Sequence, residues 1–456
     1  MNNSARPIKS ENKTIISPAK RLRGSLLLPG DKSISHRAAI ISALAHDGVS
    51  EIKNFSTGED CAATLRCLRN LGVSVEVKAD STVRIGAAGA QGFERESLAP
   101  LDCGNSGSTM RMLAGALAGQ NLTAVLTGDA SLQKRPMKRI IEPLRLMGAS
   151  ITSQANCAPL KIEGRHPLHS ISYEMPTASA QVKSCLLLAG LNAFGQTKII
   201  EKFPATRDHT ERMLRWFGVN VETQTIHDNG ASKNVLTVGG PVQFAARDFS
   251  VPGDMSSAAF FIAAAAMLDD SELEITGVGL NPTRSQILDT LRSWGVEIEI
   301  SNRRDECNEP VGDLRISRSD NLAPQKGGAN VLRGAVIASL IDELPILAVL
   351  GTQIQGGIEI RDAGELRVKE SDRIQATVEN LRRMGAAVEE FEDGLMIDGP
   401  VRLKGARVDS YGDHRIAMAF AVAALCAEGE SEIGGAECVA VSFPEFFGLL
   451  ESVIER

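Results

Sequence analysis

The sequence predicts an α/β protein of two domains, each built from three repeats of about 75 residues. Three observations carry this prediction: the chain length, a turn that begins a helix six times, and a glycine that ends a second helix in most repeats. The 456 residues exceed the roughly 250 to 300 that one hydrophobic core can serve, so more than one domain is required. An apolar content of 43% excludes a disordered chain.

The first repeat signal is a polar or glycine-containing turn followed by an alanine-rich apolar run. Its six copies are marked by Gly30, Gly104, Thr177, Gly253, Asp342 and Gly412. Successive marks are 74, 73, 76, 89 and 70 residues apart. We therefore expect six equivalent apolar helices, each beginning at its own turn.

The second repeat signal is a helix that ends in a glycine and leads into a β-branched strand. The five clear copies carry Gly72, Gly148, Gly218, Gly295 and Gly385. Each glycine lies 41 to 44 residues after the mark of the first signal. Glycine suits this position because it adopts the left-handed conformation that ends many helices. Each repeat is therefore predicted to run helix, strand, helix, strand, strand.

Two closed domains of three repeats are favoured over one continuous solenoid, because solenoid repeats usually have roughly 20 to 45 residues. The expected domains are residues 29–251, with repeats one to three, and residues 1–28 plus 252–456, with repeats four to six. If the first helix of each repeat points its N-terminus at the cleft between the domains, the helix dipoles would attract anions there.

Composition excludes several classes of protein. A net charge of -7 without a long basic run argues against a nucleic-acid surface. The longest apolar stretch, Ala258 to Leu268, has 11 residues, whereas about 20 are needed to span a membrane. The first 24 residues lack the apolar core of a secretory signal, and the eight cysteines form no CxxC pair. We expect a cytoplasmic protein with reduced thiols and with neither membrane nor nucleic-acid partners.

A zinc site is not expected. The seven histidines show neither an HExxH motif nor a cluster with cysteines. The closest pair, His166 and His169, flanks Pro167 in a predicted loop.

Basic and small residues collect at the predicted helix starts of the first half of the chain. LPGDKSISHR (28–37) places Lys32, Ser33 and Arg37 at the beginning of a helix, with Ser33 and Arg37 four residues apart on one face, where they could hold a phosphate. GNSGST (104–109) allows an anion to approach the backbone, and Arg135 lies in a proline-stiffened turn. The alternative interpretation is that these are ordinary solvated helix residues.

Charged residues at helix starts recur in the second half. ELRVKESDR (365–373) places Lys369, Glu370 and Arg373 where a helix begins. Cations at a helix start oppose the helix dipole and need an anionic partner. The alternative is pairing within the helix, with Glu365 and Asp372.

Two further segments of the second half carry candidate groups. IDELP (341–345) presents Asp342 and Glu343 between apolar runs, where a partly buried carboxylate could accept a proton. A plain helix-start carboxylate is the alternative. YGDHRIAMAF (411–420) places Asp413, His414 and Arg415 at the start of an apolar helix.

Seven motifs together resemble the family of 5-enolpyruvylshikimate-3-phosphate synthases, also called 3-phosphoshikimate 1-carboxyvinyltransferases. They are LPGDKSISHR, GNSGSTMR, SLQKRPM, SAQVKS, ELRVKESDR, YGDHRIAMAF and SFPEF, and the resemblance runs from about Gly24 to the C-terminus. It implies the enolpyruvyl transferase fold, a two-domain inverted α/β barrel of six βαβαββ units. It also implies transfer of the enolpyruvyl group of phosphoenolpyruvate to the 5-hydroxyl of shikimate 3-phosphate, in the shikimate pathway of aromatic amino acid biosynthesis. No metal, nucleotide or organic cofactor is implied.

The resemblance further implies which residues act on the substrates. Shikimate 3-phosphate would be held by Lys32, Ser33, Arg37, Ser179, Ala180, Gln181, Arg207, Asp342 and Lys369. Phosphoenolpyruvate would be held by Lys32, Gly107, Arg135, Gln181, Arg373 and Arg415. Asp342 and Glu370 would transfer protons, with Lys32 close to the reacting centre, and which carboxylate serves which proton stays open.

Three positions depart from the best-known bacterial and plant pattern of the family. Ala180 replaces a second serine, Glu365 replaces an asparagine, and Val441 replaces a lysine, so that lysine's contact with phosphoenolpyruvate is not assigned to Val441. These departures resemble the second subclass of the family, which includes members tolerant of glyphosate, an inhibitor that competes for the phosphoenolpyruvate pocket. Strongly tolerant members have alanine at the position of Gly107.

Two other functions are weighed against this one. The sister enzyme that transfers enolpyruvate to UDP-N-acetylglucosamine has the same fold and donor. It normally uses a mobile-loop cysteine and a different N-terminal lysine motif, and the sequence shows neither. A non-catalytic anion-binding protein of this fold would not need the full set of charged residues. We expect a monomer, because each domain can close its own core.

Overall fold

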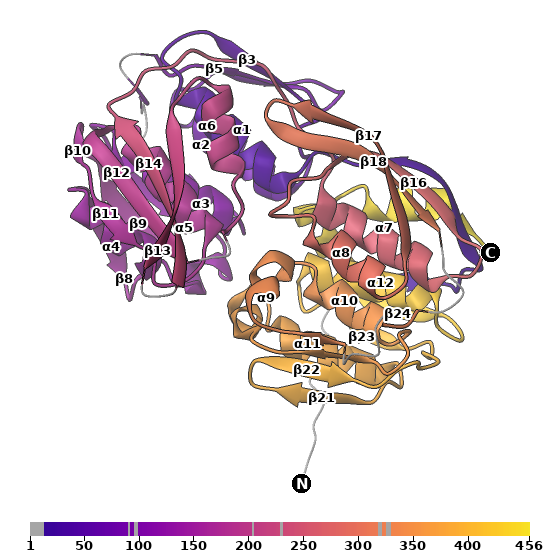
Figure 1. The fold of residues 1–456 in the computed structure, drawn as a ribbon. Coiled ribbons are helices and arrows are strands. Elements are labelled where there is room, and N and C mark those ends of the chain that lie inside the picture. The colour runs from indigo at the N-terminus through magenta and orange to yellow at the C-terminus, as the bar shows by residue number, and fades with distance from the viewer. Residues whose placement is uncertain are drawn as a thin grey trace. The chain divides into compact units, whose positions relative to one another are not determined.

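The computed structural model describes residues 13–89, 92–94, 99–202, 205–228, 231–317, 322–324 and 330–456. The chain divides into two compact units (Figure 1). Unit 1 comprises residues 1–28, 254–303 and 312–456, and unit 2 comprises residues 29–253 and 304–311.

Unit 2 differs from the expected range 29–251 in two places. It includes residues 252–253, and it includes the tip of a hairpin formed by β17 (Glu297–Glu306) and β18 (Glu309–Ser317). The tip belongs to unit 2 because it bonds to one helix there. Arg212 donates to the Asn308 carbonyl at 3.0 Å, and the His209 ring lies 2.8 Å from a Glu309 oxygen.

Unit 2 contains three repeats with the predicted order of elements. The first has α1 (Lys32–Ala43), β3 (Val49–Lys53), α2 (Glu59–Arg69), β4 (Val75–Val77) and β5 (Val83–Gly86). The second has β6 (Leu101–Asp102), α3 (Gly107–Ala118), β7 (Thr123–Thr127), α4 (Lys138–Leu146), β8 (Ser150–Gln154) and β9 (Cys157–Glu163). The third has β10 (Leu168–His169), β11 (Ser172–Glu174), α5 (Ala180–Gly190), β12 (Ala193–Lys202), α6 (His209–Trp216), β13 (Val221–Asp228) and β14 (Ala231–Gly240). His169 thus ends a short strand, although a loop was predicted there.

Each repeat of unit 2 builds one sheet with the same plan. In the second repeat β6 and β7 are parallel on either side of α3 in the sequence, and β8 and β9 form an antiparallel hairpin beside β7. The third repeat follows this plan in the order β10-β12-β14-β13. In the first repeat the leading strand is β15 (Phe249–Ser250), which lies parallel to β3. The chain therefore leaves unit 2 through the sheet in which that unit begins.

Unit 1 repeats the plan in its fourth and fifth repeats, whereas the sixth has a single strand after its second helix, and that strand pairs with β2 (Arg21–Leu27). The fourth repeat has α7 (Met255–Met267), β16 (Glu272–Gly279), α8 (Gln286–Ser293), β17 and β18. The fifth has β19 (Val331–Leu332), α9 (Ala335–Leu340), α10 (Leu344–Gly351), β20 (Ile358–Ile360), α11 (Arg373–Arg383), β21 (Val388–Phe391) and β22 (Gly394–Ile397). The sixth has β23 (Arg407–Asp409), α12 (His414–Leu425), β24 (Ser431–Gly434), α13 (Phe446–Val453) and β25 (Ile454–Glu455).

The N-terminal segment completes two sheets of unit 1. Strand β2 (Arg21–Leu27) lies parallel to β16, in the order β17-β18-β16-β2-β25, and β1 (Lys13–Ile16) pairs with β24. Figure 1 shows β16 to β18 on one side of α7 and β21 and β22 on the far side of the same unit. The predicted α/β fold of six repeats is confirmed.

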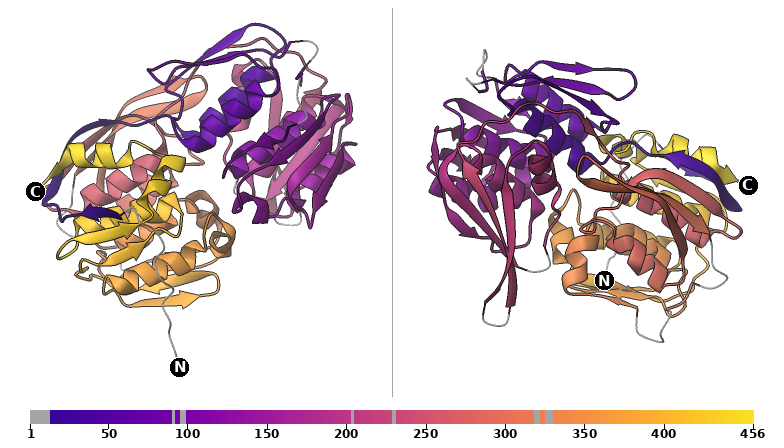
Figure 2. Two further views of the ribbon diagram at one scale, coloured as in Figure 1. Left: turned by 180° about the vertical axis from the view of Figure 1, so that it is seen from behind. Right: turned by 45° about the horizontal axis from the view of Figure 1, so that its top comes forward.

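The first helix of each repeat is buried, and the second is amphipathic. Every residue of α7 except Ser257 is buried, so this helix lies inside the core of unit 1. In unit 2, α3 packs against α5, and the left view of Figure 2 shows strands covering one side of these helices. A methyl group at Gly115 of α3 would lie 2.1 Å from the Cys185 carbonyl oxygen of α5, so the two backbones meet there. Within the described ranges, no helix is long and apolar enough to cross a bilayer.

Candidate functional site

In unit 2 the first turn of α1 presents a lysine paired with a carboxylate. Asp31 precedes the helix, and its side chain accepts from the Ile34 amide at 2.9 Å, which fixes the helix start. Lys32 Nζ lies 3.0 Å from Asp60 Oδ2, and the Lys32 side chain keeps 18% of its surface exposed. The predicted site lysine is therefore held at the surface of the unit by a buried partner.

Arg37 lies one turn below and is committed to neighbours within unit 2. Its guanidinium donates to the Ser33 carbonyl at 2.7 Å, to Thr210 Oγ1 at 2.8 Å and to Ser184 Oγ at 2.8 Å. Burial lowers the pKa of Arg37 to about 10, so it stays cationic at neutral pH. The structure thus brings Ser33 and Arg37 together through the backbone of Ser33.

The first turns of α3 and α5 meet through a bond that the sequence did not indicate. Arg111 Nη1 donates to Gln181 Oε1 at 2.6 Å, and Gln181 Nε2 donates to Ser108 Oγ at 2.8 Å. A methyl group at Gly107 would lie 2.6 Å from Arg111 Nη1 and 3.5 Å from Arg135 Nη1. Two buried guanidinium groups therefore face the start of α3.

Arg135 is fixed by the turn that carries it. The residue ends a short 3-10 helix, and its Nη2 donates to Asn105 Oδ1 at 2.6 Å. Ser179 precedes α5 as its cap and accepts from the Val182 amide at 3.4 Å, and Ala180 begins that helix. Arg207 lies in the segment before α6 and is half-buried. We call Lys32, Arg37, Gly107, Arg111, Arg135, Ser179, Ala180, Gln181 and Arg207 the unit 2 cluster.

In unit 1 Asp342 lies in the break between α9 and α10 and faces three arginines. Its carboxylate oxygens are 3.5 Å from Arg373 Nη1, 3.9 Å from Arg415 Nη2 and 4.0 Å from Arg284 Nη1. Arg415 also donates to the Asp342 carbonyl at 2.9 Å. Only 17% of the Asp342 side chain is exposed, so these charges act with little screening by water.

Arg373 begins α11 and is the most deeply buried cation of this group. It donates to Asp413 Oδ2 and to Glu370 Oε2, each at 2.7 Å. Burial alone would lower the pKa of Arg373, but Asp413 and Glu370 raise it above its ordinary value. In turn Arg373 holds the pKa of Asp413 below its ordinary value, although burial opposes this. The anion that compensates this helix-start cation is therefore mainly Asp413, 40 residues away in the sequence.

The alternative of pairing with Glu365 and Asp372 holds for Lys369 but not for Arg373. Lys369 lies 3.5 Å from Glu365, as that alternative predicts. Asp372 instead pairs with Arg367 at 2.8 Å and caps α11 by accepting from the Gln375 amide. Asp342, Lys369, Glu370, Arg373 and Arg415, together with Arg284 and Asp413, form the unit 1 cluster.

Arg111 and Arg284 belong to the clusters but were missed as candidates. Arg111 follows Gly107 by one helical turn within the quoted motif GNSGSTMR, so its spacing was a usable signal. Arg284 lies in the turn before α8 and donates to Ser256 Oγ at 2.5 Å. No spacing within the sequence connects Arg284 to Asp342, which lies in another repeat.

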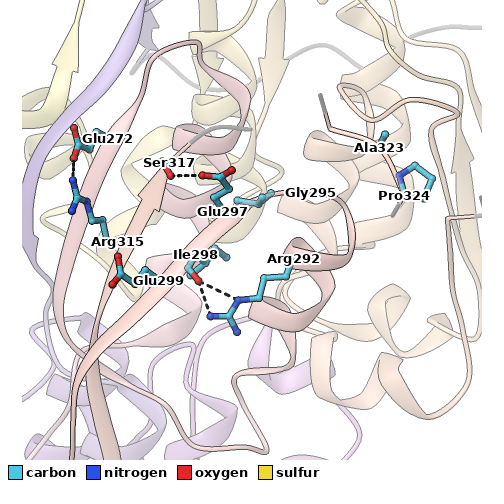
Figure 3. A pocket seen from close by; sticks show the side chains of 11 residues that line it. Glu272, Arg292, Gly295, Glu297, Ile298, Glu299, Arg315, Ser317, Ala323 and Pro324 are labelled. Atoms are coloured by element: carbon cyan, nitrogen blue, oxygen red, sulfur yellow. Dashed lines mark hydrogen bonds and ion pairs between the residues drawn. The ribbon is translucent and has the colours of Figure 1, made fainter. Parts of the chain in front are cut away.

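A cavity of 1090 Å³ in unit 1 shares no lining residue with either cluster (Figure 3). It is lined by β17, β18 and the end of α8, and several of its polar side chains bond to one another or to the backbone. Arg315 pairs with Glu272, Ser317 donates to Glu297 at 3.2 Å, and Arg292 donates to the Ile298 carbonyl at 2.8 Å. Nothing in this lining converges on a ligand. In the part of the chain that the structure describes, no group of three His, Cys, Asp or Glu residues could hold a metal ion.

Comparisons with known proteins agree over nearly the whole chain. A model of the EPSP synthase (3-phosphoshikimate 1-carboxyvinyltransferase) family matches residues 16–450. The 3-phosphoshikimate 1-carboxyvinyltransferase of Koribacter versatilis (strain Ellin345) is 50% identical over 441 residues, which cover 97% of this chain and 99% of that one. The protein of that name from Roseiflexus sp. (strain RS-1) is 50% identical over 448 residues, with 97% and 99% covered. The solved structure of EPSP synthase from Acinetobacter baumannii is 39% identical, covers 97% of this chain and 98% of its own, and has a TM-score of 0.83.

Proposed function

Because the chain belongs to the EPSP synthase (3-phosphoshikimate 1-carboxyvinyltransferase) family, we propose that it transfers the enolpyruvyl group of phosphoenolpyruvate to the 5-hydroxyl of shikimate 3-phosphate. The products are 5-enolpyruvylshikimate 3-phosphate and phosphate. The observation that carries the proposal is the 50% identity to a protein of that name along 97% of the chain. This activity belongs to the shikimate pathway of aromatic amino acid biosynthesis.

Both substrates are anions, and basic residues are assigned to each of them. The group for shikimate 3-phosphate is Lys32, Ser33, Arg37, Ser179, Ala180, Gln181, Arg207, Asp342 and Lys369. The group for phosphoenolpyruvate is Lys32, Gly107, Arg135, Gln181, Arg373 and Arg415. The buried guanidinium groups at the start of α3 and α11 support this assignment, because charge-assisted bonds are strong where water is excluded.

The chemistry is an addition followed by an elimination. The 5-hydroxyl oxygen attacks C2 of phosphoenolpyruvate while a base removes the hydroxyl proton and an acid protonates C3. The tetrahedral intermediate then loses a proton from C3 and expels phosphate, which restores the double bond.

Asp342 and Glu370 exchange these protons, and Lys32 stabilises the negative charge near the reacting carbon. The setting of Asp342 supports this role, because three guanidinium groups lie within 4.0 Å of its carboxylate oxygens and its side chain is 17% exposed. Glu370 is oriented by its bond to Arg373. Each well-placed acid or base contributes roughly 10² to 10⁴ in rate.

The proposal also covers the location, oligomeric state and subclass of the enzyme. It acts in the cytoplasm as a monomer, on small-molecule substrates and without nucleic-acid or membrane partners. The three departures at Ala180, Glu365 and Val441 support its assignment to the second, glyphosate-tolerant-like subclass.

Phosphate release with competing acceptors tests the function. The purified protein is given phosphoenolpyruvate with shikimate 3-phosphate, with UDP-N-acetylglucosamine, or with both. We expect phosphate release only where shikimate 3-phosphate is present. Release with UDP-N-acetylglucosamine alone would assign the sister activity, and no release with either acceptor would indicate a non-catalytic anion-binding protein.

A further inference from the structure

Unit 2 contains a buried ion cluster that the reaction described above does not use. Lys183 is on α5, two residues after Gln181, and its side chain is completely buried. Its Nζ lies 3.1 Å from Glu201 Oε1 on β12 and 2.8 Å from Glu211 Oε1 on α6. Both glutamates are also buried, at 1% and 2% exposure.

This cluster binds the backbone next to a predicted substrate ligand. Lys183 Nζ donates to the Thr206 carbonyl at 3.0 Å. Glu201 Oε2 accepts from the Thr206 amide at 3.1 Å and from the Thr206 hydroxyl at 2.8 Å. The backbone amide, carbonyl and hydroxyl of Thr206 are thus all held by the ion pair, and Arg207 is the next residue.

We propose that Lys183 is a positioning residue for Arg207, and that it fixes the segment 205–208 so that the Arg207 guanidinium meets shikimate 3-phosphate. The inference rests on the proposed function, because it assumes that Arg207 contacts this substrate. Lys183 itself contacts protein atoms and does not need to reach the substrate.

Energetics favour a positioning role over a purely stabilising one. Burying a lysine and two glutamates costs desolvation free energy, and apolar residues of similar volume at such places usually give equal or greater stability. Leu186 and Leu187, which follow Lys183 by about one turn of α5, are buried and apolar, so this part of the helix packs in an apolar core. What an apolar side chain could not do is bond to the Thr206 carbonyl.

The charge state of the cluster is consistent with this role. Burial alone would lower the pKa of Lys183, but Glu211 and Glu201 raise it above its ordinary value, so the lysine stays charged. Burial raises the pKa of Glu211 despite the lysine. Glu201 faces both Lys183 and Thr206, so it is the carboxylate that transmits the lysine charge to the segment.

The test compares how removal of the lysine changes the KM for shikimate 3-phosphate and the KM for phosphoenolpyruvate. We expect Lys183→Met to raise the KM for shikimate 3-phosphate about tenfold, the loss of one bond to a charged group, and to change the KM for phosphoenolpyruvate less than about twofold. Because this variant leaves two buried carboxylates unpaired, Lys183→Met/Glu201→Gln/Glu211→Gln is measured beside it. The triple variant leaves no member of the Lys183–Glu201–Glu211 cluster charged and is expected to show the same split.

Two controls separate positioning from stability. Leu187→Ala in α5 leaves a cavity in the core and should lower the midpoint of thermal unfolding without changing the ratio of the two KM values. Lys161→Met removes an exposed lysine that pairs with Glu163 and should change neither quantity.

A double-mutant cycle then connects Lys183 to Arg207. If the lysine acts through Arg207, Lys183→Met has no further effect on the KM for shikimate 3-phosphate once Arg207→Ala is present. An equal effect in both backgrounds, or an equal rise in both KM values in the folded triple variant, overturns the inference while leaving the proposed function intact. A normal KM for shikimate 3-phosphate in Arg207→Ala alone removes Arg207 from the binding site, which overturns the inference through its premise.

Discussion

Gly107→Ala is expected to weaken inhibition by glyphosate at least about tenfold, with a smaller penalty on phosphoenolpyruvate. In the proposed assignment, Gly107 lines the pocket for which these two molecules compete. The added methyl would lie 2.6 Å from Arg111 Nη1 and 3.5 Å from Arg135 Nη1. Carbon atoms do not approach other heavy atoms within about 3 Å, so the Arg111 guanidinium must move by a few tenths of an ångström.

Displacing the Arg111 guanidinium costs free energy, because the group is buried and hydrogen-bonded. Arg111 is 5% exposed and donates to Gln181 at 2.6 Å, so it cannot turn away into water without breaking that bond. Overpacking a filled site typically costs 1 to 3 kcal/mol, which corresponds to about a 5- to 150-fold change in affinity. Glyphosate is longer than phosphoenolpyruvate and needs more of the narrowed pocket. We therefore expect glyphosate to lose more binding affinity than phosphoenolpyruvate does.

The assay is steady-state inhibition by glyphosate against phosphoenolpyruvate, for wild type and Gly107→Ala side by side. Gly239→Ala is a matched control, because a methyl group there meets no atom within 4 Å. Equal inhibition constants for wild type and Gly107→Ala would refute the argument. Equal losses of inhibitor and substrate would show that the methyl acts by moving Arg111 and Gln181 and not by narrowing the pocket.

Two further predictions concern catalysis and stability. Asp342→Ala should lose at least roughly 10² in kcat with the fold intact. Asp342→Asn should still bind shikimate 3-phosphate by calorimetry, and near-normal turnover of either variant would remove Asp342 from the mechanism. Burial, together with the charges of Lys32 and Arg37, lowers the pKa of His36 well below 6.5. As the pH falls, the unfolded chain therefore binds a proton at His36 before the folded chain does. The free energy of unfolding should decrease below about pH 6.5 for this reason. The free energy of unfolding is measured by chemical denaturation at neutral pH and at about pH 5. Between these two pH values, His36→Asn should retain up to about 2 kcal/mol of the free energy of unfolding that wild type loses. The same loss in both proteins would contradict a role of His36 in this pH dependence.

Much of the fold was predictable because its signals are local. All five glycines of the second repeat signal adopt positive φ, from 80° at Gly72 to 101° at Gly148, as a helix that turns into a strand requires. The longest spacing, 89 residues, falls where the fifth repeat gains α9 before α10. That extra helix was not predicted, because its six residues are too few to show a periodicity.

The partners of the charged residues could not be predicted. The sequence indicated that the cation at Arg373 needs an anion, but its partner Asp413 comes from another repeat and is brought near by the packing of α11 against α12. Lys183, Glu201 and Glu211 come from a helix, a strand and a second helix of one repeat. Their meeting depends on tertiary structure, and spacing along the chain does not encode it.

The close approach of α3 and α5 at Gly115 has a consequence for attempts to redesign this enzyme. Gly107 and Gln181 lie at the starts of these two helices. The backbone contact at Gly115, two turns after Gly107, therefore fixes the distance between Gly107 and Gln181. Random mutagenesis scored by activity would find Gly115 as intolerant as a residue that touches substrate, although it lies inside the core. A library aimed at the pocket should therefore hold Gly115 constant and vary the loops that precede the helices.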